Sequence, residues 1–184
     1  MNWESIIPNV AAAGELPAAQ TAMDNDQFTA FYDRASRPLW AYLARTSGDP
    51  ALADDLMQES FIRFLTGTPP LDGEVASRRY LFRIGTNLLR DHWRRNRTVS
   101  IDELPPERSA APDNSAQSDS RLTLSPALAR LRPRDRQLLW LAHAENYSHR
   151  EIAEITGLAT ASIRLLLFRA RREMSRLLTR GGGL

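Results

Sequence analysis

The feature that most constrains the fold is a stretch in the middle of the chain that cannot form a packed core. Residues 98–125 read TVSIDELPPERSAAPDNSAQSDSRLTLS, and Pro105, Pro106 and Pro112 each remove a backbone donor and fix φ. Most of the other residues are Ser, Asp, Asn and Ala, which have little apolar surface to bury. A structureless loop of this length is uncommon inside one compact domain. We therefore predict a flexible, acidic linker at residues 98–123.

The segments on either side of this linker are predicted to be helical. Apolar residues recur there at intervals of three and four, and the alternation typical of strands is missing. The expected helices cover residues 26–46, 50–66, 76–96, 124–131, 134–145, 149–156 and 160–178. We expect an all-α protein with an N-terminal tail (residues 1–23) and two small helical domains (residues 24–97 and 124–184).

Charge divides the chain into blocks of opposite sign. The 24 basic residues are all arginine, and 22 acidic residues bring the net charge to only +2. Residues 75–97 hold seven Arg against one Asp, and residues 126–184 hold eleven Arg against five acids. Residues 24–74 hold nine acids against four Arg. Two separate basic blocks indicate two contacts with a polyanion.

Composition also disfavours several classes of protein. No run approaches the roughly 18 apolar residues of a membrane span, and the acidic N-terminus does not resemble a signal peptide, so we expect no membrane insertion. Cysteine is absent, which excludes disulfides and thiolate sites and suits a cytoplasmic location. The three histidines lack metal-binding spacing, and no phosphate loop or nucleophile elbow is present. No catalytic residue, metal or cofactor is therefore expected.

The predicted helix that reads RRYLFRIGTNLLRDHWRRNR carries a row of arginines. One side of its helical wheel is apolar and holds Leu81, Ile84, Gly85, Leu88 and Leu89. The other side holds, at intervals of three and four, Arg79, Arg83, Thr86, Arg90, Arg94 and Arg97. Guanidinium groups in a row suit phosphates, and Trp93 beside them suits stacking on unpaired bases. A solvated basic face is the alternative, but the row contains no acid, which favours nucleic acid.

The helix that reads ALADDLMQESFIRFL combines a core face with an acidic outer face. The core face is expected to hold Ala53, Met57, Phe61 and Phe64. The outer face holds Asp55, Gln58, Glu59 and Ile62. An exposed isoleucine within polar neighbours is typical of a protein-docking patch, although these residues alone fit a solvated surface equally well. Acid–base catalysis is disfavoured, since the segment contains no histidine or nucleophile.

Residues 148–178 show the pattern of a helix-turn-helix. Ser148 and Glu151 form a capping-box signature, and Gly157 follows a short helix where a tight turn needs a left-handed residue. The second helix has a core face made of Ile163, Leu166, Leu167, Ala170, Met174 and Leu177. Its outer face presents Thr160, Ala161, Arg164, Arg169, Arg171 and Arg172. Such a helix enters the major groove of DNA.

Taken together, these motifs resemble the extracytoplasmic-function (ECF) sigma factors, the smallest members of the sigma-70 family, over residues 25–178 apart from the linker. LADDLMQESFIRFL resembles the helix that docks on a coiled coil of the polymerase β′ subunit, which implies that Asp55, Gln58, Glu59 and Ile62 make that contact. YLFRIGTNLLRDHWRRNR resembles the helix that melts and reads the −10 element. With the arginine row, its expected contacts are Arg79, Arg83, Asn87, Arg90, Trp93, Arg94, Arg95 and Arg97.

The C-terminal motif SHREIAEITGLATASIRLLLFRARREM resembles the helix-turn-helix that reads the −35 element. The expected contacts are Thr160, Ala161, Ser162, Arg164, Arg169, Arg171 and Arg172. The resemblance also implies core RNA polymerase (β′ clamp coiled coil and β flap), promoter DNA and an anti-sigma factor as partners. It implies no enzymatic activity of the chain itself.

Two departures from the family pattern concern the second helix of this motif. Ala159 stands where the family usually has a capping serine, so either Thr160 caps the helix or the cap is lost, at about 1 kcal/mol. Leu165 and Leu166 stand where the family commonly has Ser and Arg. Leu165 and Phe168 are expected to point outward, where a leucine could touch a thymine methyl group or lie under an inhibitor protein.

Two other functions fit parts of the sequence. A DNA-binding regulator with an N-terminal sensing domain would bind duplex operator DNA without polymerase, but it leaves the arginine row unexplained. A helical hydrolase could use Asp54, Asp55 and Glu59, but the sequence offers no supporting ligand set.

Overall fold

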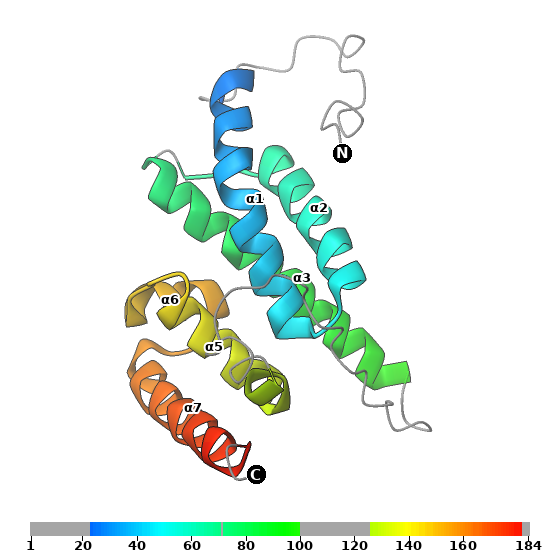
Figure 1. Cartoon of the computed structure of the whole chain (residues 1–184). Coiled ribbons are helices and arrows are strands. Elements are labelled where there is room, and N and C mark those ends of the chain that lie inside the picture. The colour runs from blue at the N-terminus through cyan, green and yellow to red at the C-terminus, as the bar shows by residue number, and fades with distance from the viewer. Residues whose placement is uncertain (1–22, 71, 100–125, 182–184) are drawn as a thin grey trace.

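The regular structure of the chain is helical throughout the residues that the computed structural model describes, which are 23–70, 72–99 and 126–181 (Figure 1). The first three helices are α1 (Asn25–Ser47), α2 (Pro50–Thr66) and α3 (Glu74–Val99). The C-terminal part contains a short helix at residues 126–130, followed by α5 (Pro133–His143), α6 (His149–Thr156) and α7 (Thr160–Gly181). The predicted all-α class is confirmed.

The predicted tail and linker fall almost entirely outside the described residues. Within them, α3 continues to Val99, so this helix extends past residue 97, where the first domain was expected to end. The domain limits at residues 24–97 and 124–184 therefore stay a prediction. No described helix is long and apolar enough to cross a membrane.

Local signals in the sequence account for the ends of α1 and α2. The Asp24 carboxylate accepts a hydrogen bond from the Gln27 backbone at 2.8 Å, which caps the start of α1. Gly48 ends α1 in the left-handed conformation, with φ at 78°. Asp49 then caps α2, and Pro50 occupies the first turn, where its missing N–H has no partner to lose.

The first domain is a three-helix unit in which α1, α2 and α3 pack against one another. Gly85 of α3 faces side chains of both α1 and α2. A Cβ at this position would lie 3.1 Å from Leu39 Cδ1 on α1 and 3.3 Å from Ser60 Oγ on α2. The missing side chain therefore lets α3 pack tightly against both neighbours.

In the second domain, α7 packs on α5 and α6. Its core is filled by side chains that are almost fully buried: Leu138, Leu141, Ile152, Ile155, Ile163, Leu167 and Ala170. The core face predicted for α7 is confirmed at Ile163, Leu167 and Ala170, whereas Leu166, Met174 and Leu177 are partly buried at its edge.

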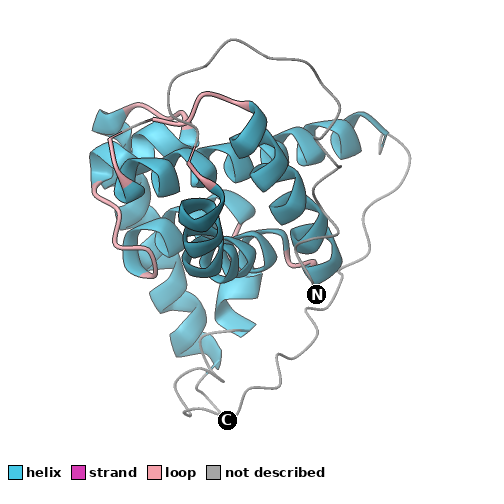
Figure 2. Ribbon diagram, turned by 90° about the horizontal axis from the view of Figure 1, so that it is seen from above, coloured by secondary structure: helices cyan, strands magenta, loops and turns pink. Residues whose placement is uncertain are grey.

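The two domains also pack against each other, so the helices form one contiguous body (Figure 2). Helix α6 lies against α3, and α5 lies against α1. Tyr42 is fully buried at this junction; its hydroxyl accepts a hydrogen bond from Gln137 Nε2 at 2.6 Å and lies 2.7 Å from Thr86 Oγ1. Burial raises the pKa of Tyr42 to about 12. A neutral, hydrogen-bonded tyrosine therefore links α1, α3 and α5.

Candidate nucleic-acid and protein interfaces

The arginine row of α3 divides into an exposed part and a part covered by the second domain. Arg83, Arg90, Arg94 and Arg95 are exposed along the middle and C-terminal half of the helix. The guanidinium of Arg83 lies 5.2 Å from the centre of the Tyr80 ring, and Arg90 Nη2 donates to Asn87 Oδ1 at 2.8 Å. These contacts hold two cations and one amide on the same outer surface, where phosphates or base edges can reach them.

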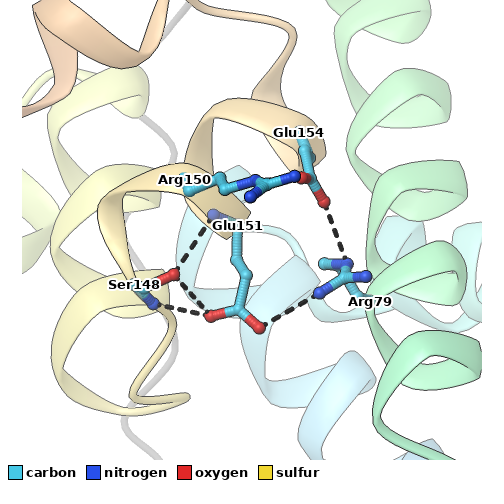
Figure 3. Close-up of polar contacts among 5 residues, drawn as sticks. All are labelled: Arg79, Ser148, Arg150, Glu151 and Glu154. Atoms are coloured by element: carbon cyan, nitrogen blue, oxygen red, sulfur yellow. Dashed lines mark hydrogen bonds and ion pairs between the residues drawn. The ribbon is translucent and has the colours of Figure 1, made fainter.

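Arg79, at the covered end of the row, binds two carboxylates of α6 (Figure 3). Its Nη1 lies 3.2 Å from Glu151 Oε1, and its Nε lies 3.1 Å from Glu154 Oε2. Arg90 is also close to the second domain, since a Cβ on Gly157 would lie 3.6 Å from its Nη1. The first helix of the helix-turn-helix and the turn after it therefore lie beside the arginine row in this arrangement.

The prediction that Thr86 lies on the arginine side of α3 is wrong. Thr86 is buried, with an exposed fraction of 2%, and its hydroxyl pairs with Tyr42. A helical wheel groups residues by angle alone and cannot show that α1 presents a hydroxyl partner to this position. The partner of Thr86, Tyr42, lies on α1 of the first domain and also accepts from Gln137 of the second, so this position borders the junction between the domains. Trp93 lies near the other end of the helix, half-buried against the core, and the side chain of Arg97 lies outside the described residues.

The outer face of α2 agrees with the predicted patch. Asp55 is exposed, Gln58 and Glu59 are partly exposed, and Ile62 retains 44% of its accessible surface. Glu59 pairs with Arg63 at 2.7 Å. The opposite face, made of Ala53, Met57, Phe61 and Phe64, is buried as expected. Leu65, which the sequence analysis did not single out, is 53% exposed and extends the apolar part of the patch by one turn.

The helix-turn-helix has the local geometry that its sequence predicts. The capping box is complete: Ser148 Oγ accepts from the Glu151 backbone at 3.3 Å, and the Glu151 carboxylate accepts from the Ser148 backbone at 2.9 Å. The bonds from Ser148, together with Arg79, hold the pKa of Glu151 below its ordinary value. Gly157 ends α6 in the left-handed conformation, with φ at 71°. These features fix the angle at which α7 leaves the turn.

The predicted outer face of α7 is exposed over its first four turns. Its exposed polar and small residues are Thr160, Ala161, Ser162, Arg164, Arg169, Arg171 and Arg172. Arg171 Nε donates to His143 Nε2 at 3.2 Å, which ties this arginine back to α5. Leu165 and Phe168 are exposed on the same face. The surface is thus cationic with an apolar centre.

The start of α7 gives a prediction on stability. Helix α7 begins at Thr160, and the Ala159 carbonyl accepts the first bond from the Ser162 backbone at 2.9 Å, so Ala159 occupies the capping position without a side-chain acceptor. Ala159→Ser should raise the free energy of unfolding by about 1 kcal/mol in urea titrations followed by circular dichroism. Ala161→Ser, inside the helix, is the matched control and should give no gain. Equal effects of the two substitutions would contradict a missing cap.

Polar contacts between the domains were not predicted from the sequence. Arg78 Nη2 forms an ion pair with Glu145, whose side chain is only 5% exposed and also accepts from Trp140 Nε1 at 3.2 Å. Burial raises the pKa of Glu145 above its usual value, while Arg78 and the Trp140 hydrogen bond oppose that shift. The partner could not be identified because it lies in the other domain.

Comparison with known families follows the same division of the chain. The family model described as Sigma-70 region 2 matches residues 31–99, and the model described as Sigma-70, region 4 matches residues 121–174. The first match covers most of α1, α2 and α3, and the second covers the helix-turn-helix as far as the fourth turn of α7. The two sets of surface residues described above therefore lie in the two matched regions.

Individual relatives share most of their length with the chain. It is 30% identical over 151 residues to the ECF RNA polymerase sigma factor SigL of Mycobacterium tuberculosis, covering 79% of this chain and 85% of that protein. It is also 30% identical over 157 residues to the RNA polymerase sigma factor CarQ of Myxococcus xanthus, covering 83% and 90%. The solved structure of the sigma factor RpoE, in complex with the anti-sigma factor NepR from Bartonella quintana, has the same fold. It superposes with a TM-score of 0.67 at 21% identity and covers 83% of this chain and 96% of that one.

Proposed function

Because the chain belongs to the ECF sigma factors of the sigma-70 family and directs transcription initiation by RNA polymerase, we propose that its two domains divide promoter recognition between them. The first domain docks on core polymerase and holds the −10 element, and the second binds the −35 element. The observation that most supports this division is the exposed, arginine-rich face of α7, which follows a capped α6 and a left-handed glycine turn. The chain makes and breaks no bond, since polymerase adds the nucleotides.

The outer face of α2 is the proposed docking site for the polymerase β′ coiled coil. Its proposed contacts are Asp55, Gln58, Glu59 and Ile62. An isoleucine that stays 44% exposed between carboxylates provides an apolar anchor with a polar rim. The buried face of the same helix packs on α1 and α3, so the patch is held on a rigid support.

The exposed face of α3 is proposed to bind the −10 element. Its proposed contacts are Arg83, Asn87, Arg90, Trp93, Arg94, Arg95 and Arg97. Arg79 can join them only when α6 has moved away, because Glu151 and Glu154 occupy its guanidinium in the packed arrangement. A DNA strand that replaces these carboxylates would neutralise the Arg79 guanidinium with its phosphates in the same way. Binding of the −10 element by Arg79 therefore requires the two domains to separate.

The second domain is proposed to place α7 in the major groove of the −35 element and to contact the polymerase β flap. The proposed DNA contacts are Thr160, Ala161, Ser162, Arg164, Arg169, Arg171 and Arg172. An anti-sigma factor is a further proposed partner, since the RpoE structure was solved with one, and the proposed location is the cytoplasm.

Run-off transcription tests this function. Bacterial core polymerase would be assayed with and without the full-length protein on fragments from the genome that encodes it. We expect specific transcripts only when the protein is present. No specific transcript, combined with tight binding of the protein alone to duplex DNA, would refute the proposal and favour the operator-binding regulator.

A further inference from the structure

Two large apolar side chains are exposed on the face of α7 that is proposed to meet DNA. Leu165 is 51% exposed and Phe168 is 60% exposed. They are not displaced core residues, because Ile163, Leu167 and Ala170 already fill the core side of the same helix and are at most 1% exposed. Helix α7 packs on α5 and α6 (Figure 1), and both side chains stay exposed on its outer face. Packing within the described residues therefore does not explain the apolar pair.

These side chains form a narrow row with Ala161. Spacings of four and three residues place Ala161, Leu165 and Phe168 within about 60° of one another around the helix axis. At about 1.5 Å per residue the row is about 10 Å long, which corresponds to about three base pairs at 3.4 Å each. Ala161, the residue nearest the start of the helix, is small enough for the backbone to come close to a partner.

The charged residues beside this apolar row indicate what kind of partner it binds. Arg164 and Arg169 stand on opposite sides of the row, Arg172 continues it, and all three are exposed. Within the described part of the chain they have no hydrogen bond or ion pair. The acid nearest to them on α7, Glu173, is paired with Arg176 at 2.7 Å. An apolar ridge edged by unpaired guanidinium groups fits a groove with anionic walls and an apolar feature on its floor.

The major groove of DNA has this chemistry. Its walls are phosphates, and the C5-methyl group of thymine is the one apolar group on its base edges. Leucine and phenylalanine have no donor or acceptor with which to read the other edges. Resting on the proposed function, we propose that Leu165 and Phe168 determine specificity in the −35 duplex by contacting thymine methyl groups, while the flanking arginines hold the phosphates.

Replacement of thymine by uracil tests this proposal, because it removes only the methyl group. The probe is a duplex selected from a random double-stranded pool by core polymerase assembled with the full-length protein, with each thymine of the −35 segment replaced in turn by uracil. At one or more positions we expect binding to weaken about fourfold, the factor that corresponds to roughly 0.8 kcal/mol for one buried carbon group.

The variants then assign that effect to side chains. Leu165→Ala or Phe168→Ala should bind the thymine and uracil duplexes equally at the affected position, whereas Val75→Ala, which shortens an exposed apolar residue on α3, should keep the full difference. Arg172→Ala should weaken both duplexes by the same factor. Both apolar positions are more than half exposed, so neither truncation should unfold the chain, which circular dichroism verifies.

Three outcomes would count against the proposal. A selected duplex whose binding does not respond to uracil at any position overturns the inference but leaves the proposed function standing. A uracil effect that persists in both alanine variants also overturns it, since other side chains would then contact the methyl group. Failure to select any duplex contradicts the proposed function, and the inference with it.

Discussion

Replacing Ile62 by glutamate is expected to weaken the binding of this sigma factor to core RNA polymerase by about thirtyfold or more, the effect of losing roughly 2 kcal/mol at a central interface residue. Ile62 is the apolar centre of the α2 patch, with Asp55 and Glu59 around it. A carboxylate at this position would have to be buried without a partner when the patch is covered. Specific run-off transcription should fall in parallel.

The matched control for this experiment is Val75→Glu. Val75 is the exposed apolar residue at the start of α3, 67% exposed, and it receives the same new charge outside the patch. Affinity for core polymerase, measured by fluorescence anisotropy with labelled protein, should stay near the wild-type value in this variant. Equal losses in both variants would show that added negative charge, rather than the α2 patch, determines docking.

Removing the arginine of the inter-domain ion pair should destabilise the chain strongly. In Arg78→Ala the Glu145 carboxylate, 5% exposed, would keep only the Trp140 hydrogen bond. Breaking a buried pair by removing one partner costs roughly 3–5 kcal/mol, and because the Arg78 side chain is 34% exposed we expect about 2–3 kcal/mol at neutral pH. Urea unfolding followed by circular dichroism measures this loss.

The pH dependence distinguishes an unpaired buried charge from lost packing. The pKa of Glu145 is raised in the folded chain, so its contribution is most favourable at low pH and declines as the carboxyl ionises. Without Arg78 the pKa rises further, and ionisation costs more. The deficit of Arg78→Ala should therefore shrink when unfolding is repeated near the usual glutamate pKa of about 4.3.

A double-mutant cycle with Glu145→Gln completes the test of the ion pair. The amide keeps the shape of the side chain and can still accept from Trp140, but it carries no charge. Adding Glu145→Gln to Arg78→Ala should recover part of the lost stability. A deficit that is the same at both pH values, and that the amide does not reduce, would mean that Arg78 stabilises the chain through its stem alone.

Much of the fold followed from short-range patterns. The ends of α1, α2 and α6 lie where Asp24, Asp49 and Ser148 supply side-chain acceptors, and Gly48 and Gly157 adopt the left-handed turns that stop the helices. Each of these interactions joins residues no more than four positions apart. They can therefore be recognised in a sequence without knowledge of any other part of the chain.

The outer faces of the helices were predicted as well as the helix ends were, wherever a helix has a single core face. On α2 and α7 the residues expected to point outward are exposed or partly exposed, because each helix packs mainly within its own domain. The predicted outer face was partly wrong on α3, which packs against helices of both domains. Thr86 is buried and pairs with Tyr42 of α1. Arg79 is bound by two carboxylates because α6 of the second domain covers that end of α3.

By itself, then, the sequence determined the helices, their caps, the faces of α2 and α7 and the family of the protein, since periodicity and motif spacing are local properties. Only the tertiary structure decided how the domains meet. The pairs that join them, Tyr42 with Gln137 and Arg78 with Glu145, are separated by 95 and 67 residues. Contacts over such distances depend on the shapes of two folded cores, and no local pattern in the chain specifies which buried polar groups will find each other.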